Sequence, residues 1–205
     1  MTSPPCATRR PIRFKFRPDK LADALSYLAA RVTDLTTMKA AKLLYLADRL
    51  HLLRYGRPII GDWYACREHG PVPSSTYDLL QRIRDPEPRS SSPSLEMLRT
   101  RIRARGRGPY APFGPTSKAA VLAALSETDV EALEQTVRQH GRKSAWIVRN
   151  LTHQHAAWKR CWEAGEHEID YRLFFADEPD ATAVLALMEE EQDGRDVIRA
   201  LERHR

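Results

Sequence analysis

The chain has 205 residues and a formal net charge of +6, which suits one compact domain with an appendage and makes two full domains a tight fit. No apolar run approaches the roughly 20 residues that a membrane-spanning helix needs, so we expect a cytoplasmic protein without a membrane partner. The three cysteines, Cys6, Cys66 and Cys161, match neither a disulfide framework nor a zinc-finger spacing, which argues against structural zinc.

The first third of the chain predicts a loose arm followed by two helices. Residues 1–17 are basic and proline-bearing, as is typical of a flexible arm. A leucine stripe predicts a helix over 18–31, and a capping threonine predicts a second helix over 36–55 that ends at Gly56. Because apolar residues cover more than one face of this second helix, we expect it to be the buried centre of the fold.

The next segments predict a strand, a turn and a helix. Residues 63–67 are aromatic and extended in character, and Gly70 and Pro71 indicate a turn. A serine at 74 or 75 begins a helix that passes Ile83. The proline- and serine-rich segment 85–94 is typical of a flexible connection.

Residues 98–107 alternate between arginine and mostly apolar side chains, which predicts a strand that pairs with the strand at 63–67. One face of this strand would carry an arginine ladder, made of Arg99, Arg101, Arg103, Arg105 and Arg107. The ladder is suited to phosphates, to an acidic protein or to the acidic segment 163–193 of the same chain. A charged edge that prevents strand pairing is the plainer interpretation.

The last third of the chain predicts further helices. One begins with a capping box at 126–129 and ends at Gly141, a short one follows Ser144, and the next carries Trp158 and Trp162. Later helices are expected from Pro179 through Leu187 and from Asp193 to the end. The sequence thus predicts a mainly α fold, a compact helical domain around a buried helix with a two- or three-stranded β element. We expect an arm at 1–17, this domain at 18–165 and an extension at 166–205 packed on or near it.

Sites for catalysis, cofactors or metals have little support in the sequence. None of the phosphate-binding, hydrolase or metalloprotease motifs GxGxxG, GxxxxGK[ST], GxSxG and HExxH occurs. His153 and His155, together with another histidine or a carboxylate, are suitable metal ligands, but their spacing points them apart on a helix. Cys66 lies three residues from His69, yet a buried, unreactive thiol is the simpler interpretation. We therefore predict no catalytic residue, no metal site and no cofactor.

Several short motifs between residues 42 and 158 resemble one known family. They are Lys42-Leu-Leu-Tyr-Leu-Ala-Asp48, Tyr55-Gly56, Pro58-Ile59, Gly61-Asp62, Ala65, His69-Gly-Pro-Val72, Tyr77 and Leu151-Thr-His153 with Trp158. This combination resembles the Panacea domain of the SocA-like antitoxin family. The resemblance implies a mostly helical antitoxin domain that neutralises a toxin protein encoded beside it, largely by direct contact and without enzymatic activity.

The resemblance and the residue chemistry together give two sets of site residues, with the function concentrated in residues 42–80. The structural signature comprises Lys42, Leu43, Tyr45, Asp48, Gly56, Gly70, Pro71, Val72, Thr152, His153 and Trp158. The expected partner-binding residues are Asp62, Tyr64, Arg67, His69, Tyr77, Arg99, Arg101 and Arg103. The predicted partner is a cognate toxin from an adjacent gene. The alternative is a nucleic-acid-associated regulator that uses the basic arm and the arginine ladder.

Overall fold

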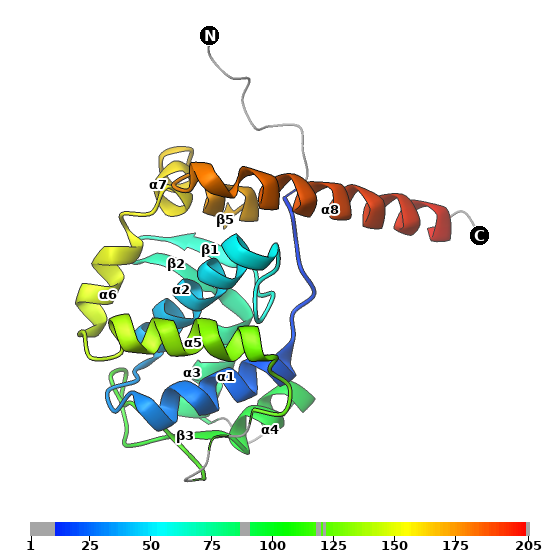
Figure 1. The fold of residues 1–205 in the computed structure, drawn as a ribbon. Coiled ribbons are helices and arrows are strands. Elements are labelled where there is room, and N and C mark those ends of the chain that lie inside the picture. Colours follow the sequence, from blue (N-terminus) through cyan, green and yellow to red (C-terminus); the bar gives the residue numbers. More distant parts are fainter. Residues whose placement is uncertain (1–10, 87–90, 118–119, 121, 204–205) are drawn as a thin grey trace.

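The computed structural model describes residues 11–86, 91–117, 120 and 122–203, and the side chains of the last helix only as far as residue 194. The helices are α1 (Pro18–Arg31), α2 (Thr37–Tyr55), α3 (Ser74–Arg84), α4 (Pro93–Arg99), α5 (Glu127–His140), α6 (Ala145–Thr152), α7 (Ala156–Glu163) and α8 (Thr182–Arg203), with short 3-10 turns η1 (Tyr171–Phe175) and η2 (Pro179–Ala181). Figure 1 shows these helices around two small sheets. The predicted mainly α fold is confirmed.

Helix α2 is the centre of the structure, as its sequence predicts. It contacts α1, α3, α5, α6 and α8 (Figure 1). The Thr36 hydroxyl accepts a hydrogen bond from the backbone N–H of Lys39, which caps its first turn. Gly56, with φ +67°, ends the helix in the left-handed conformation that glycine adopts without strain.

The main sheet has three strands in the order β2-β1-β5. Strand β1 (Tyr64–Arg67) pairs antiparallel with β2 (Gly70–Pro73) and, on its other edge, with β5 (Glu168–Ile169). The segment from residue 166 through η1, which the sequence assigns to an extension packed on or near the domain, therefore supplies a strand of the main sheet. Its aromatic residues Tyr171 and Phe174 are buried against Tyr64, so this segment completes both the sheet and the core.

The strand predicted over residues 98–107 forms only in part, because the segment begins in a helix. Residues up to Arg99 belong to α4, because Ser92 caps this helix and Leu95 and Leu98 are buried at helical spacing. The strand is reduced to β3 (Ile102–Ala104), which pairs with β4 (Phe113–Pro115) and not with β1. The start of α4 also shortens the predicted flexible connection, of which residues 87–90 lie outside the described part of the chain.

The part of the predicted arm that the structure describes, residues 11–17, is packed against the domain. Ile12 is buried, and the backbone N–H of Arg17 donates to the carbonyl of Ile60 over 2.8 Å. Arg13 forms an ion pair with Glu168 of β5, so the basic start of the chain does meet the acidic segment. Residues 1–10 lie outside the described residues.

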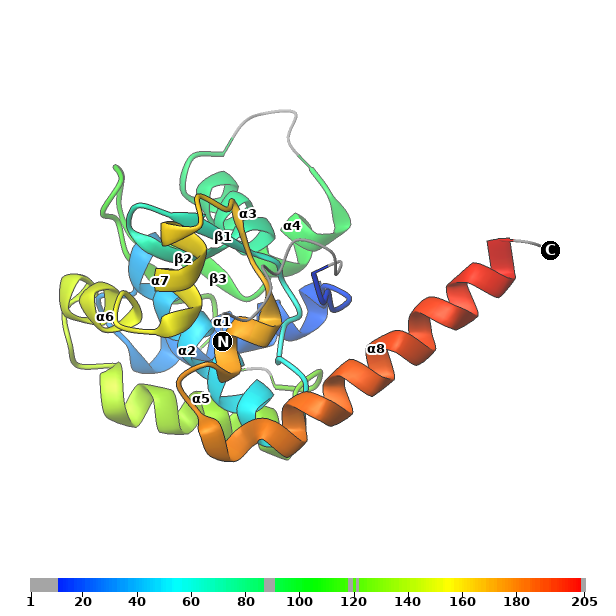
Figure 2. The ribbon, with the colours of Figure 1, turned by 90° about the horizontal axis from the view of Figure 1, so that it is seen from above.

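Helix α8 is one continuous helix, whereas the sequence predicted two. Its first half rests on the domain through the buried Met188 and through Glu189, which pairs with Arg172. The predicted break is absent because Asp193 and Gly194 both continue the helix. Figure 2 shows the second half extending beyond the rest of the molecule. In the described part of the chain, every helix is too short or too polar to cross a bilayer.

A buried carboxylate joins α2 to the segment that leads into β1. Asp48 is fully enclosed and accepts hydrogen bonds from the backbone N–H groups of Ile59 and Ile60 and from the hydroxyl of Tyr64, at 2.9 to 3.2 Å. Burial raises the pKa of this carboxyl to about 7, while the three donors act in the opposite direction. Asp48 thereby fixes the position from which the sheet starts.

We expect Asp48→Ala to lower the free energy of unfolding by roughly 3 kcal/mol or more, because it leaves three buried donors without an acceptor. Tyr64→Phe is the matched control, since it removes one of the same bonds and should cost ~1 kcal/mol. Urea denaturation of the three proteins measures both values. Equal losses in the two variants would contradict the central role of Asp48.

Candidate functional site

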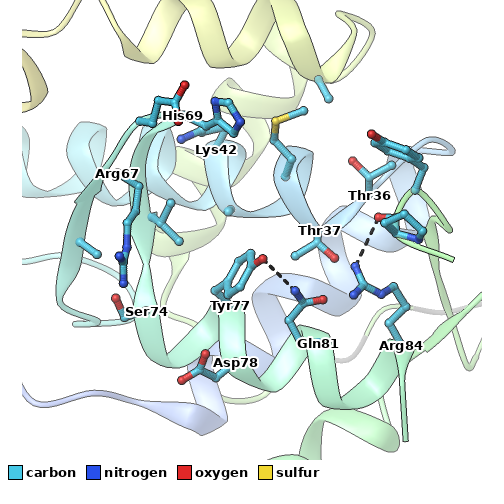
Figure 3. A pocket seen from close by; sticks show the side chains of 18 of the residues that line it. Thr36, Thr37, Lys42, Arg67, His69, Ser74, Tyr77, Asp78, Gln81 and Arg84 are labelled. Carbon is cyan, nitrogen blue, oxygen red and sulfur yellow. Dashed lines mark hydrogen bonds between the residues drawn. The ribbon is translucent and has the colours of Figure 1, made fainter.

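A groove of about 910 Å³ opens beside the N-terminal half of α2. Its walls come from α2, the β1–β2 hairpin, α3, the start of α6 and the loop at 109–110. Figure 3 shows Tyr77, Gln81 and Arg84 of α3 along one wall, with Lys42 and His69 close together at one end. The groove is thus built mainly from residues 36–84, which include the region 42–80 where the sequence concentrates the function.

Aromatic side chains that are exposed to solvent surround this groove. Trp63 is 42% exposed, Tyr77 38%, Trp146 54% and Tyr110 76%. Large aromatic residues are normally buried, and exposed clusters of them are typical of surfaces that bind other proteins. The groove therefore has the composition of a protein-binding surface.

The Lys42 end of the groove is basic. Lys42 is 1% exposed and its ammonium donates to the carbonyl of Pro71 over 2.8 Å. Burial, with a smaller effect from the charge of Arg149, lowers the pKa of Lys42 to about 7. The Arg149 guanidinium lies 3.4 Å from Nδ1 of His69, and His69 in turn contacts the edge of Trp146. This end of the groove therefore favours an anionic group.

The structure brings only some of the predicted partner-binding residues to the groove. Arg67, His69 and Tyr77 line it, whereas Asp62 and Tyr64 are fully buried beneath it. The expectation of an exposed contact is wrong for Asp62, because its carboxylate accepts hydrogen bonds from the first turn of α3, from Ser75 and Thr76. Asp62 thus caps α3 from a distant part of the chain, a role that no local motif reveals.

The predicted arginine ladder does not form one surface. Arg99 pairs with Glu96 within α4, and Arg101 pairs with Asp23 of α1 at 2.9 Å. Arg103 is exposed on β3, outside the groove. Neither of the paired arginines contacts the acidic C-terminal segment, and their ion pairs reduce the charge that a nucleic acid would meet.

The later signature residues hold the β1–β2 hairpin in place. The indole N–H of Trp158 donates to the carbonyl of Arg67 over 2.9 Å, and His153 stacks on Trp158 with ring centres 4.0 Å apart. Thr152 is buried and donates to the carbonyl of Arg149. The remaining signature residues serve the fold or the groove. Leu43, Tyr45 and Asp48 are buried, and Gly56 ends α2. Gly70 and Pro71 belong to β2, and Val72 of the same strand lines the groove.

The described residues offer neither a metal-binding cluster nor an activated Cys66 thiol. No group of three His, Cys, Asp or Glu side chains there is placed to hold a metal ion. Burial raises the pKa of the Cys66 thiol, which makes it a weaker nucleophile, and its sulfur faces the carbonyl of Trp158. Cys66 behaves as a packing residue in this geometry.

Sequence reasoning missed several aromatic residues of the groove. Trp63 lies within residues 42–80, where the sequence concentrates the function, but it is not among the expected partner-binding residues, and Trp146 and Tyr110 carry no functional prediction. Their signal lies in their chemistry, since each is a large aromatic residue in or beside a predicted turn or helix start without an apolar pattern that requires burial. Their common position became visible only when three distant segments met in the fold.

One comparison with known proteins gives a match. The family model described as Antitoxin SocA-like, Panacea domain, matches residues 41–159, which is more than half of the chain. No curated protein and no solved structure matches the chain significantly. The matched region begins in α2 and ends in α7, so it contains most of the groove.

We expect Gly70→Ala to destabilise the fold by about 3 kcal/mol. Gly70 has φ +89°, and a Cβ at this position would lie 2.8 to 2.9 Å from His153 and Lys42. Gly108→Ala is the control, because Gly108 has φ +93° but open space around its Cβ, so only the conformational cost of about 1 kcal/mol applies. Thermal or urea unfolding compares the two variants. Equal losses would show that the hairpin does not pack tightly on Lys42 and His153.

The low pKa of Lys42 predicts a pH-dependent stability. Between about pH 7 and pH 10 the unfolded chain keeps this lysine protonated while the folded protein loses the proton, so the unfolded state binds more protons. The Lys42 contribution to stability therefore rises with pH in this window, by at most ~1.4 kcal/mol per pH unit. Urea unfolding of the wild type and of Lys42→Met at several pH values should show the difference, whereas a constant difference would contradict the shifted pKa.

Proposed function

Because the chain belongs to the antitoxin SocA-like family with the Panacea domain, we propose that it neutralises a protein toxin by binding it directly. The proposed contact surface is the groove beside α2, with its exposed aromatic residues. The protein acts in this proposal by covering a surface of the toxin, without a chemical step of its own.

The observation that carries this proposal is the coincidence of the family match with the groove. The matched residues 41–159 supply Lys42, Trp63, His69, Tyr77 and Trp146, which come from α2, the β1–β2 hairpin, α3 and α6. Central aromatic residues contribute most of the binding energy in many protein interfaces. A preformed groove also limits the ordering cost on the antitoxin side of the complex.

The direct test is co-expression of this chain with the protein encoded by the adjacent gene. We expect the neighbouring protein to stop growth when it is expressed alone, and the chain to restore growth and to co-purify with it. A neighbouring protein that is harmless alone and forms no complex with this chain would exclude the proposed function.

Variants of the groove test where the toxin binds. We expect Trp63→Ala and Tyr77→Ala each to weaken toxin binding by about 30-fold, because truncating a central aromatic contact costs ~2 kcal/mol. Isothermal titration calorimetry measures the affinity, and growth rescue reports the consequence in cells.

Trp162→Ala is the matched control for these variants. Trp162 is 48% exposed, close to the exposure of Trp63, but it lies on α7 away from the groove. It should leave toxin binding unchanged. If Trp162→Ala weakens binding as much as Trp63→Ala does, the contact surface lies elsewhere.

A further inference from the structure

Four cationic or titratable side chains lie near one another at the end of the groove that Lys42 and His69 line. The position of a Cβ on Gly70 would lie 2.9 Å from Nζ of Lys42 and 2.9 Å from Nε2 of His153, so both nitrogens approach the same point. His69 and Arg149 complete the group, with the Arg149 guanidinium 3.4 Å from Nδ1 of His69. We call Lys42, His69, Arg149 and His153 the basic cluster.

The hydrogen-bonding capacity of the basic cluster is only partly used within the described chain. Lys42 has three N–H donors and one recorded acceptor, the carbonyl of Pro71. Nε2 of His153 and Nε of Arg149 are buried and have no partner among the described residues. Within the same described ranges, no carboxylate lies at ion-pair distance from Lys42 or Arg149.

A buried ammonium without a counterion is costly, and a protein normally pairs it or deprotonates it. Other buried lysines of this chain follow the rule, since Lys39 pairs with Asp34 and Lys20 with Asp129. Lys42 is the exception on α2, and its side chain borders the groove. The missing counterion is therefore best supplied from the groove.

We propose that the basic cluster is an anion subsite that receives a carboxylate, an Asp or Glu side chain of the partner protein. This inference rests on the proposed function and adds the chemistry of one contact to it. A carboxylate accepts through two oxygens, which suits the free N–H groups of Lys42, whose side chain lines the groove, while Arg149 adds positive charge behind it.

The rest of the groove favours a carboxylate over a phosphate. Glu68 and Asp78 also line the groove and would repel the second charge of a phosphate. The aromatic residues Trp63, Tyr77 and Trp146 of the same groove suit a protein segment that places one acidic side chain near apolar ones. Lys42 already lies out of water in the free protein, so the complex loses little further hydration of this side chain, and a carboxylate beside it favours the protonated form that burial disfavours.

The first experiment uses the complex of the full chain with the adjacent gene's protein. Lys42→Met should weaken binding by about 30-fold or more, since it removes one partner of a buried charged pair. Arg149→Gln, at the edge of the cluster, should weaken it less and guards against a folding defect in the first variant. Lys159→Met removes an exposed lysine from α7 and serves as the control.

A double-mutant cycle then identifies the carboxylate. Each Asp and Glu of the partner is changed to Ala and measured against wild-type chain and Lys42→Met. We expect one acidic residue of the partner whose change to Ala weakens binding to the Lys42→Met variant at least tenfold less than it weakens binding to the wild-type chain. Binding by a folded Lys42→Met that equals the wild type, or a cycle without any coupled residue, overturns the subsite.

A second experiment does not depend on the toxin. Sodium acetate is titrated into the isolated full chain at constant ionic strength, with sodium chloride as the reference, while NMR follows the side-chain signals of Lys42. A saturable shift with acetate supports the subsite even if no toxin complex exists, in which case only the proposed function fails. Identical responses to acetate and chloride in a chain that also binds no partner overturn the subsite.

Discussion

The arrangement of this protein depends on a helix that is buried although it carries charged side chains. Helix α2 places Lys39, Lys42 and Asp48 in the interior, and each must find a partner there. Asp48 finds three donors in the segment that leads into β1, and Lys42 reaches the carbonyl of Pro71 in β2. The polar groups of the central helix thus fix the position of the hairpin, and the hairpin forms one wall of the groove.

This dependence explains why the family signature marks a scaffold and a surface together. Trp158 and His153 hold the hairpin from the side of α6 and α7, while Asp48 and Lys42 hold it from α2. These contacts leave other side chains of the hairpin free to face the groove. Arg67 and His69 are two of them. The groove is therefore a rigid surface, and variation can occur at its exposed positions without loss of the supporting contacts.

Local sequence signals predicted most of the helices, whereas long-range partners had to come from the structure. Capping threonine and serine residues and the glycine at 56 gave the bounds of α2, α5 and α6 closely. The alternation around Arg99 predicted a strand where the chain forms the end of α4. The burial of Leu95 and Leu98 at helical spacing favours the helix there. Asp62 gave no local signal as the cap of α3, and the aromatic groove depends on contacts between segments that are far apart in sequence.

Strand β5 has a consequence for synthesis of the chain. Its register places Ile169 opposite Tyr64, so the edge of β1 stays unpaired until the ribosome has released a segment roughly one hundred residues downstream. A nascent chain of this protein therefore has an open sheet edge while residues 68–167 are being made. Pairing by β5 then closes the edge and brings Tyr171 and Phe174 into the core, so the sheet and the core are completed only after this later segment has been made.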